Sequence, residues 1–421
     1  MKNFIYKLKQ NDVLKKILYW GIVSFLFLYT FSIPAFSGRS GWYIISYFLM
    51  AALAGCTIVY SFLYTHFKIN KWLIIPGSFV VFAFLGTAIY SHSFAGSTGK
   101  IGWTTLILMF VTLIIFYYAF ISVENIKLIQ MVLIFAFLIF AFYFAFIYRD
   151  KIIHLQFSSD RINIYFDNQN TIGFYFAIAY TLSLFTGLFY KRKLELLFLI
   201  PAAIFFFLGF FTGSRAFLIS IIIGSVVVAF YKLKNHKIIF LVVLGCMIGL
   251  FIVLINIPQF AFLKDQFDRT IYTIFGVGNS KVDTSTVQRA VWPGYAFYLG
   301  GQNLLFGFGV NGFSIYSGVG TYAHNNFAEV ICDFGLIGFV LFNASFIIPF
   351  VLSFKAKNTN LYLVPVLFFI YFIRSFFGVV YYSKETYLVL ALLFFLTKDC
   401  KLPSLSFKNK TSFIDYYEVR I

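Results

Sequence analysis

The sequence predicts an all-α polytopic membrane protein with about twelve transmembrane helices in a single membrane domain, residues 1–421. Of its residues, 61% are hydrophobic and 11% are charged, whereas soluble domains carry roughly 25% charged residues. Apolar runs long enough to cross a hydrocarbon layer of about 30 Å follow one another along the chain. These runs are continuous and do not alternate with polar residues, so helices, not barrel strands, are expected to satisfy the backbone in lipid.

The predicted spans follow the apolar runs at 17–36, 42–64, 72–90, 101–121, 127–147, 171–190, 194–211, 215–231, 238–257, 330–353, 361–380 and 384–397. Charged residues interrupt the last two, and the final run is short for a bilayer. The first run has no small-residue cleavage site after it, so it is interpreted as a retained helix and not as a signal peptide.

The distribution of positive charge predicts the orientation. The net charge of +18 could suggest a nucleic-acid partner, but most of the 33 Lys and Arg residues fall in the two terminal segments and in short loops on the side of the N-terminus. Such loops are typically cytoplasmic. We therefore predict a multi-pass protein of the cytoplasmic (inner or plasma) membrane, with both termini and the tail 401–421 in the cytoplasm and no nucleic-acid partner. The four cysteines show no disulfide or metal spacing.

Two long segments, 148–170 and 258–329, then lie outside the cytoplasm. Loops of this length are uncommon unless they are functional or disordered. The larger one joins predicted spans nine and ten. Within it, Ser285 and Gln288 resemble a capping box, which predicts a short helix carrying Arg289 and Trp292 and bent at Pro293.

Three side chains that are predicted to lie on the external side of the membrane are candidates for catalysis. Arg215 follows Gly213 and Ser214 between two apolar runs; an arginine at this depth usually faces a polar cavity, although it could instead anchor at the interface. Arg289 could hold an anion or be a solvated surface charge. His324 could accept a proton near neutral pH or simply bond at a helix start.

Further polar and aromatic residues surround these three and are candidates for substrate binding: Arg161, Asn170, Ser214, Trp292, Asn325 and Glu329. Amides near a helix start can bond sugar hydroxyls or phosphate, although N-capping is the simpler interpretation. The stretch 307–312 matches GxGxxG by letters, but it lacks the βαβ context of a dinucleotide site. Its glycines are expected to form turns. No metal and no cofactor is predicted.

The coincidence of arginines, a histidine and amides on one side of the membrane suggests group transfer from a lipid-linked phosphate donor. Arginines bind phosphate through two parallel hydrogen bonds. A histidine among them could remove the proton of an acceptor hydroxyl.

Short sequence blocks occur in a defined order over roughly residues 160–345: Arg161 with Asn168-Gln-Asn170, Gly213-Ser-Arg215-Ala, Arg289-Ala-Val-Trp292, Phe306-Gly-Phe-Gly309 with Gly312-Phe313, and Ala323-His-Asn325 with Glu329, Asp333, Gly335 and Gly338. In this order, and with the large external loop, they resemble the O-antigen ligase and O-antigen polymerase family of bacterial membrane proteins. Family members usually have a proline shortly before the Gly-x-Gly block. This chain has Asn303-Leu-Leu there, a departure that concerns loop shape.

The resemblance implies a membrane-embedded, GT-C-like glycosyltransferase that is metal-independent and inverts the anomeric carbon. It implies an undecaprenyl-diphosphate-linked oligosaccharide as donor. Arg215 and Arg289 would hold the diphosphate, and His324 would activate the acceptor hydroxyl.

The preferred function is a surface-polysaccharide repeat-unit polymerase, which joins the glycan to an acceptor glycan on the outer side of the cytoplasmic membrane during lipopolysaccharide, capsule or exopolysaccharide biosynthesis. The alternative is an O-antigen ligase that transfers the glycan to lipid A core or to protein. A flippase for the lipid-linked sugar is a more remote alternative, because neither repeated halves nor broken helices are apparent in the sequence. A chain-length regulator and a flippase are possible partners.

Overall fold

The computed structural model describes Tyr6 and residues 8–36, 41–65, 71–89, 102–153, 168–190, 193–257, 261–275, 284–354 and 358–400. Within these residues the chain forms helices joined by turns and loops, without a strand. Ten helical stretches within them are long and apolar enough to cross a membrane, which confirms the predicted all-α polytopic class. The predicted tail 401–421 lies outside the described residues.

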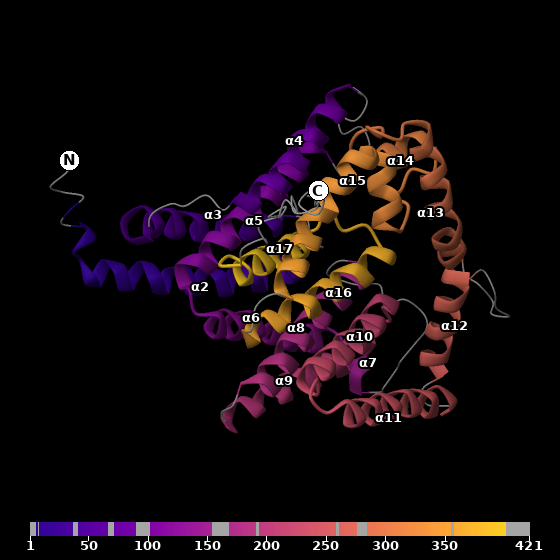
Figure 1. Cartoon of the computed structure of the whole chain (residues 1–421), viewed down its shortest axis with the longest axis horizontal. Helices are drawn as coiled ribbons and strands as arrows, with labels where there is room; N and C mark the ends of the chain where they lie inside the picture. Colours follow the sequence, from indigo (N-terminus) through magenta and orange to yellow (C-terminus); the bar gives the residue numbers. More distant parts are fainter. Residues whose placement is uncertain are drawn as a thin grey trace, which may run out of the picture.

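The long apolar helices account for ten of the predicted spans. They are α2 (Asp12–Phe36), α3 (Tyr43–Tyr60), α4 (Ile74–Ile89), α5 (Trp103–Val123), α6 (Ile126–Ile147), α8 (Gln169–Phe189), α9 (Leu199–Phe211), α10 (Arg215–Lys232), α15 (Asn326–Ser353) and α16 (Leu363–Phe376). Four of them reach the length of a span together with an adjoining π-helical or 3-10 segment, as Tyr43–Thr65, Lys71–Ile89, Lys193–Phe211 and Thr359–Phe376. The short helix α7 (Arg149–Ile153) follows α6. Figure 1 shows the bundle that they form.

The predicted number of about twelve spans is higher than these ten, and the difference lies in two helices. The helix α17 (Lys384–Leu396) has 13 residues, about 20 Å at 1.5 Å per residue. Its residues 385–395 are all buried, so its ends meet protein and not lipid, where a short helix is tolerated. The helix α11 (Lys237–Asn256) has 20 residues, and its stretch Lys237–Val253 counts among the shorter apolar helices of the described residues.

Hydrogen bonds between helix ends define two opposite faces of the bundle. At one end, Lys232 donates to the Leu188 carbonyl and Lys234 to the Tyr362 hydroxyl at 2.6 Å. At the other end, Ser214 Oγ lies 3.1 Å from Asn170 Oδ1. The lysine-rich face is the one that the charge distribution predicts to be cytoplasmic. We call the opposite face, which carries Ser214 and Asn170, the site face.

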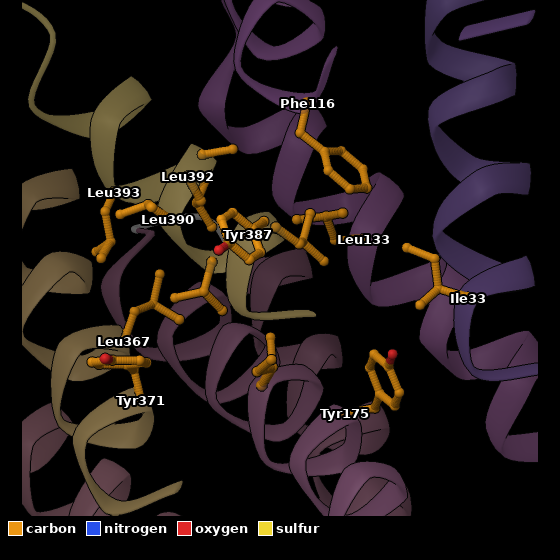
Figure 2. Close-up of a cluster of buried hydrophobic side chains, with 14 of the residues drawn as sticks. Ile33, Phe116, Leu133, Tyr175, Leu367, Tyr371, Tyr387, Leu390, Leu392 and Leu393 are labelled. Atoms are coloured by element: carbon orange, nitrogen blue, oxygen red, sulfur yellow. The ribbon is translucent and has the colours of Figure 1, made fainter. Parts of the chain in front are cut away.

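The centre of the bundle is packed with large side chains from α5, α6, α8, α16 and α17. In lipid, helices associate through close packing and not through a hydrophobic driving force. The rings of Phe346 and Tyr371 stack with centroids 3.6 Å apart. Figure 2 shows part of this cluster, in which the labelled side chains are Ile33, Phe116, Leu133, Tyr175, Leu367, Tyr371, Tyr387, Leu390, Leu392 and Leu393.

Much of the large predicted loop 258–329 is helical. It contains α12 (Ala261–Phe275), α13 (Thr284–Gln302) and the short α14 (Gly312–Tyr316). Along one flank of the molecule, α12 and α13 follow each other between α11 and α14 (Figure 1). The predicted helix around Arg289 is confirmed, but it is 19 residues long and continues through Pro293.

The helix α15 is broken at Gly335, which adopts φ 61° and ψ −167°, so the expectation that the chain has no broken helix was wrong. Backbone groups on both sides of the break bond to the loop before α14: Gly309 N–H donates to the Asp333 carbonyl at 2.7 Å, and Leu336 N–H to the Leu304 carbonyl at 2.7 Å. These bonds satisfy polar groups that the break releases within a span. The glycines of the Gly-x-Gly block thus do more than form turns, because they let this loop approach α15 closely.

Replacing Gly335 with alanine is expected to destabilise the protein strongly. A Cβ there would lie 2.4 Å from the Leu305 carbonyl carbon, and the backbone conformation alone costs a non-glycine residue about 1–3 kcal/mol. The midpoint of thermal unfolding in detergent should fall by several degrees, or folded protein should be lost. Gly245→Ala is the matched control, since nothing lies within 4 Å of its Cβ position. Equal midpoints for the two variants would contradict the steric explanation.

Candidate functional site

Arg215 is the first residue of α10 and is buried, with 5% of its surface exposed. The preceding Gly213 has φ 61°, a conformation that favours glycine and lets the chain turn from α9 into α10. Ser214 caps the helix by accepting from Phe217 N–H at 3.2 Å, and its hydroxyl donates to Asn170 Oδ1 at 3.1 Å. Two predicted binding residues, Ser214 and Asn170, are therefore in direct contact.

The Arg215 guanidinium reaches across to α12. Its Nη1 donates to the Arg269 carbonyl at 2.9 Å and to Thr273 Oγ1 at 3.0 Å. The side chain is therefore buried against α12, and its contact with a substrate stays a prediction. The two hydrogen bonds also show that α12 lies at the start of α10, although α10 ends on the lysine-rich face. The helix α11 therefore brings the chain back from the lysine-rich face to α12.

His324 lies between two aromatic rings. Its imidazole stacks on Trp292, with centroids 5.4 Å apart and an interplanar angle of 12°. The ring of Tyr322 meets it edge-on at 4.4 Å. His324 also has φ 61°, which is uncommon for a residue other than glycine and is often found at functional sites. The side chain is half-buried, so its ring is fixed while part of its surface remains accessible.

The turn that carries His324 is held by its neighbours. Asn325 caps α15 by accepting from Phe327 N–H at 3.0 Å and Ala328 N–H at 3.1 Å. Glu329 is 1% exposed, and its Oε2 accepts a hydrogen bond from Ala323 N–H. Asn325 and Glu329 therefore fix the backbone on the two sides of His324. That they also contact the substrate stays a prediction.

Substituting Asn325 with alanine is expected to reduce both stability and transfer. Loss of an N-cap side chain costs about 1 kcal/mol, and here the capped turn also fixes His324. Asn325→Asp keeps the acceptor and should retain both properties. Asn358→Ala, which removes a cap on the lysine-rich face, should lower the unfolding midpoint but leave transfer intact. Loss of transfer in Asn358→Ala as well would show that the effect is general destabilisation.

Arg289 reaches this region through α13. It precedes Trp292 by three residues in the same helix, so the two side chains lie on neighbouring turns of one face. Trp292 stacks on His324, so Arg289 stands one turn of α13 before the residue that contacts the histidine; its contact with the diphosphate stays a prediction. The remaining predicted residue, Arg161, lies outside the described residues.

A series of side-chain contacts connects the surroundings of His324 with those of Arg215. Asn168 Nδ2 donates to the Tyr322 hydroxyl at 3.3 Å, and Tyr322 in turn touches His324. Asn168 precedes α8 by one residue and lies beside Asn170, which bonds to Ser214. Neither Asn168 nor Tyr322 was singled out individually by the sequence analysis, although both stand within two residues of a predicted site residue.

A cavity of about 460 Å³ opens on the same face. Its lining comes from the ends of several helices and includes Asn168, Asn170 and Tyr322 together with Arg374, Tyr382 and Glu385. From the sequence, Arg374 and Glu385 were expected only as charges that interrupt apolar runs, and Tyr382 was not predicted. No group of three or more His, Cys, Asp or Glu residues that could hold a metal ion occurs in the described part of the chain.

Comparison with known families identifies the region that carries these residues. The sequence profile described as O-antigen ligase matches residues 200–343. The match runs from α9 to the middle of α15 and includes Arg215, Arg289 and His324. No curated protein matches the chain. Residues 200–343 are thus similar to the O-antigen ligase domain, and this match supports the predicted resemblance to the O-antigen ligase and polymerase family.

Proposed function

We propose that the protein is a surface-polysaccharide repeat-unit polymerase. It transfers a glycan from undecaprenyl diphosphate to a hydroxyl of an acceptor glycan, with the site face directed outward from the cytoplasmic membrane. The observation that carries this proposal is His324, which is held between Trp292 and Tyr322 at the junction of α13 and α15. A fixed, half-accessible histidine suits the activation of a hydroxyl, and arginines suit the stabilisation of a phosphate leaving group.

In the proposed reaction, neutral His324 accepts the proton of the acceptor hydroxyl while that oxygen attacks the anomeric carbon of the donor sugar. The bond between this carbon and the diphosphate oxygen breaks, and the undecaprenyl diphosphate departs with the electron pair. Attack from the side opposite the leaving group inverts the anomeric configuration. One glycosidic bond forms for each phosphoester bond lost.

Arg215 and Arg289 stabilise the negative charge that grows on the diphosphate. Positive groups fixed before the reaction are often the largest catalytic contribution. The two hydrogen bonds from Arg215 Nη1 to α12 orient the plane of its guanidinium. Arginines in this role supply the positive charge that other phosphate-transfer sites take from a metal ion, which supports a metal-independent reaction.

The polymerase is preferred over the ligase because polymerases occur in bacteria with and without lipopolysaccharide. Deletion of the gene separates the two, with the surface and lipid-linked glycans as the measurement. A lost polymerase leaves a single repeat on the acceptor, whereas a lost ligase leaves full-length glycan on undecaprenyl lipid. In liposomes, movement of lipid-linked sugar without transfer or elongation would reject the glycosyltransferase and support a flippase.

A further inference from the structure

Arg374, in the last turn of α16, is a buried cation whose position the proposed reaction does not explain. Its side chain belongs to a residue that is 4% exposed, and its Nε and Nη1 atoms have no hydrogen-bond partner among the described residues. Burial of a charged group without compensating bonds is unfavourable. Such a group is expected where a ligand supplies the missing acceptors.

The surroundings of Arg374 are shaped to hold its guanidinium. Gly378 lies directly beside it, where a Cβ would stand 2.1 Å from Nη1. The guanidinium carbon lies 5.9 Å from the centre of the Phe174 ring. A residue larger than glycine at 378 would displace the cation, so the local sequence accommodates it and also leaves it facing the cavity that it lines.

The cavity combines groups that suit a sugar with an acidic substituent. Its volume of about 460 Å³ falls within the range of about 300–1,000 Å³ of small-molecule sites. Asn168, Asn170 and Tyr382 offer amide and hydroxyl groups for sugar hydroxyls. Arg374 and Lys384 supply positive charge against the single carboxylate of Glu385.

The cavity is also adjacent to the proposed reaction centre. Tyr322 lines it and touches the His324 ring. Asn170 lines it and bonds to Ser214, the neighbour of Arg215. A sugar unit held in the cavity would therefore be close to the glycosidic bond that is formed.

We propose that this cavity is a subsite for an acidic sugar unit of the glycan substrate, in which Arg374 binds the carboxylate through two parallel hydrogen bonds. The inference rests on the proposed glycan transfer for its choice of ligand. Arg374 would bind an oxyanion, and both a sugar carboxylate and the donor diphosphate carry one. A uronate is favoured because Glu385 faces the same cavity and repels a multiply charged diphosphate more strongly than a single carboxylate.

The test is binding of sodium glucuronate to the purified full-length protein in lipid nanodiscs, measured by ligand-observed NMR, with glucose and inorganic pyrophosphate as comparison probes. Glucuronate should bind the wild type more tightly than glucose does. Arg374→Gln should weaken glucuronate binding at least tenfold, whereas Glu385→Gln, which removes the competing carboxylate but keeps an acceptor for the Tyr175 hydroxyl, should strengthen it. Arg149→Gln, at an exposed arginine, should change nothing.

Equal glucuronate binding by the wild type and Arg374→Gln would overturn the proposal. So would weaker binding in Glu385→Gln, since that result would make Arg374 and Glu385 a purely structural pair. Tighter Arg374-dependent binding of pyrophosphate than of glucuronate would assign the cavity to the donor diphosphate instead. Because no donor is present, the assay is independent of catalysis: glucuronate binding without transfer in liposomes rejects the enzyme and keeps the subsite.

Discussion

Replacement of His324 with asparagine is expected to reduce glycan transfer by about 10²–10⁴-fold, the usual contribution of a general base. Asparagine tolerates the left-handed conformation that His324 adopts, so the turn should persist while the proton acceptor is lost. The measurement is the length distribution of surface glycan in a deletion strain that carries the variant gene. The amount of protein in the membrane should equal that of the wild type.

His324→Ala should have the same effect on transfer, with an added loss of stability because alanine is strained at φ 61°. His236 supplies the control. It is exposed and lies just before α11, on the lysine-rich face, and His236→Ala should retain full-length glycan. Near-normal polymer in His324→Asn would remove this residue as the base.

Substitution of Arg215 is expected to have the second large effect. Arg215→Ala removes a buried cation from the proposed diphosphate site, and a loss of about 10²–10³-fold in transfer is expected from the removal of one such fixed group. Arg215→Lys keeps the charge but loses the planar fork, so its activity should fall between alanine and the wild type. Transfer from a radiolabelled lipid-linked donor in liposomes measures both variants.

Arg215→Ala could also reduce transfer because Arg215 holds α12 in place, and the contact between them allows this explanation to be tested. Thr273→Val removes one of the two acceptors of Arg215 Nη1 without changing the charge. If Arg215 acts mainly on the diphosphate, Thr273→Val should reduce transfer far less than Arg215→Ala. Equal losses would show that Arg215 serves to hold α12 in place.

The long apolar helices were predictable because each depends on residues that are adjacent in sequence. The helix α12 was not, because Lys264, Asp265 and Asp268 give it a polar character that resembles a loop. Its Asp265–Arg269 ion pair at 2.9 Å, with i,i+4 spacing, is the local signal that could have identified it. The break at Gly335 could not be predicted either, because the carbonyls that bond to the residues after it belong to Leu304 and Leu305, which are far from it in the sequence.

Part of the candidate site could also be predicted from residues that are close in sequence. His324, Asn325 and Glu329 belong to one short segment, and their mutual contacts follow from helix geometry. The cavity around Arg374 depends on Asn168, Tyr322 and Glu385, which are far apart in the sequence. No local pattern indicates that these helix ends meet, so only the folded structure connects Arg374 with the histidine.

The first turns of α15 are fastened to the segment between α16 and α17. Asn326 Oδ1 accepts from Val380 N–H at 2.9 Å and from Tyr381 N–H at 3.1 Å. The Tyr381 hydroxyl donates to Asp333 Oδ2 at 2.7 Å, and burial raises the pKa of this phenol well above its ordinary value, so its proton stays in place. The proton acceptor and the cavity wall are therefore parts of one rigid unit. Under the proposed function and the proposed subsite, this unit keeps the bound acidic sugar at a constant distance from His324. That distance determines which hydroxyl of the acceptor reaches the histidine. It therefore sets the regiochemistry of every bond in the polymer.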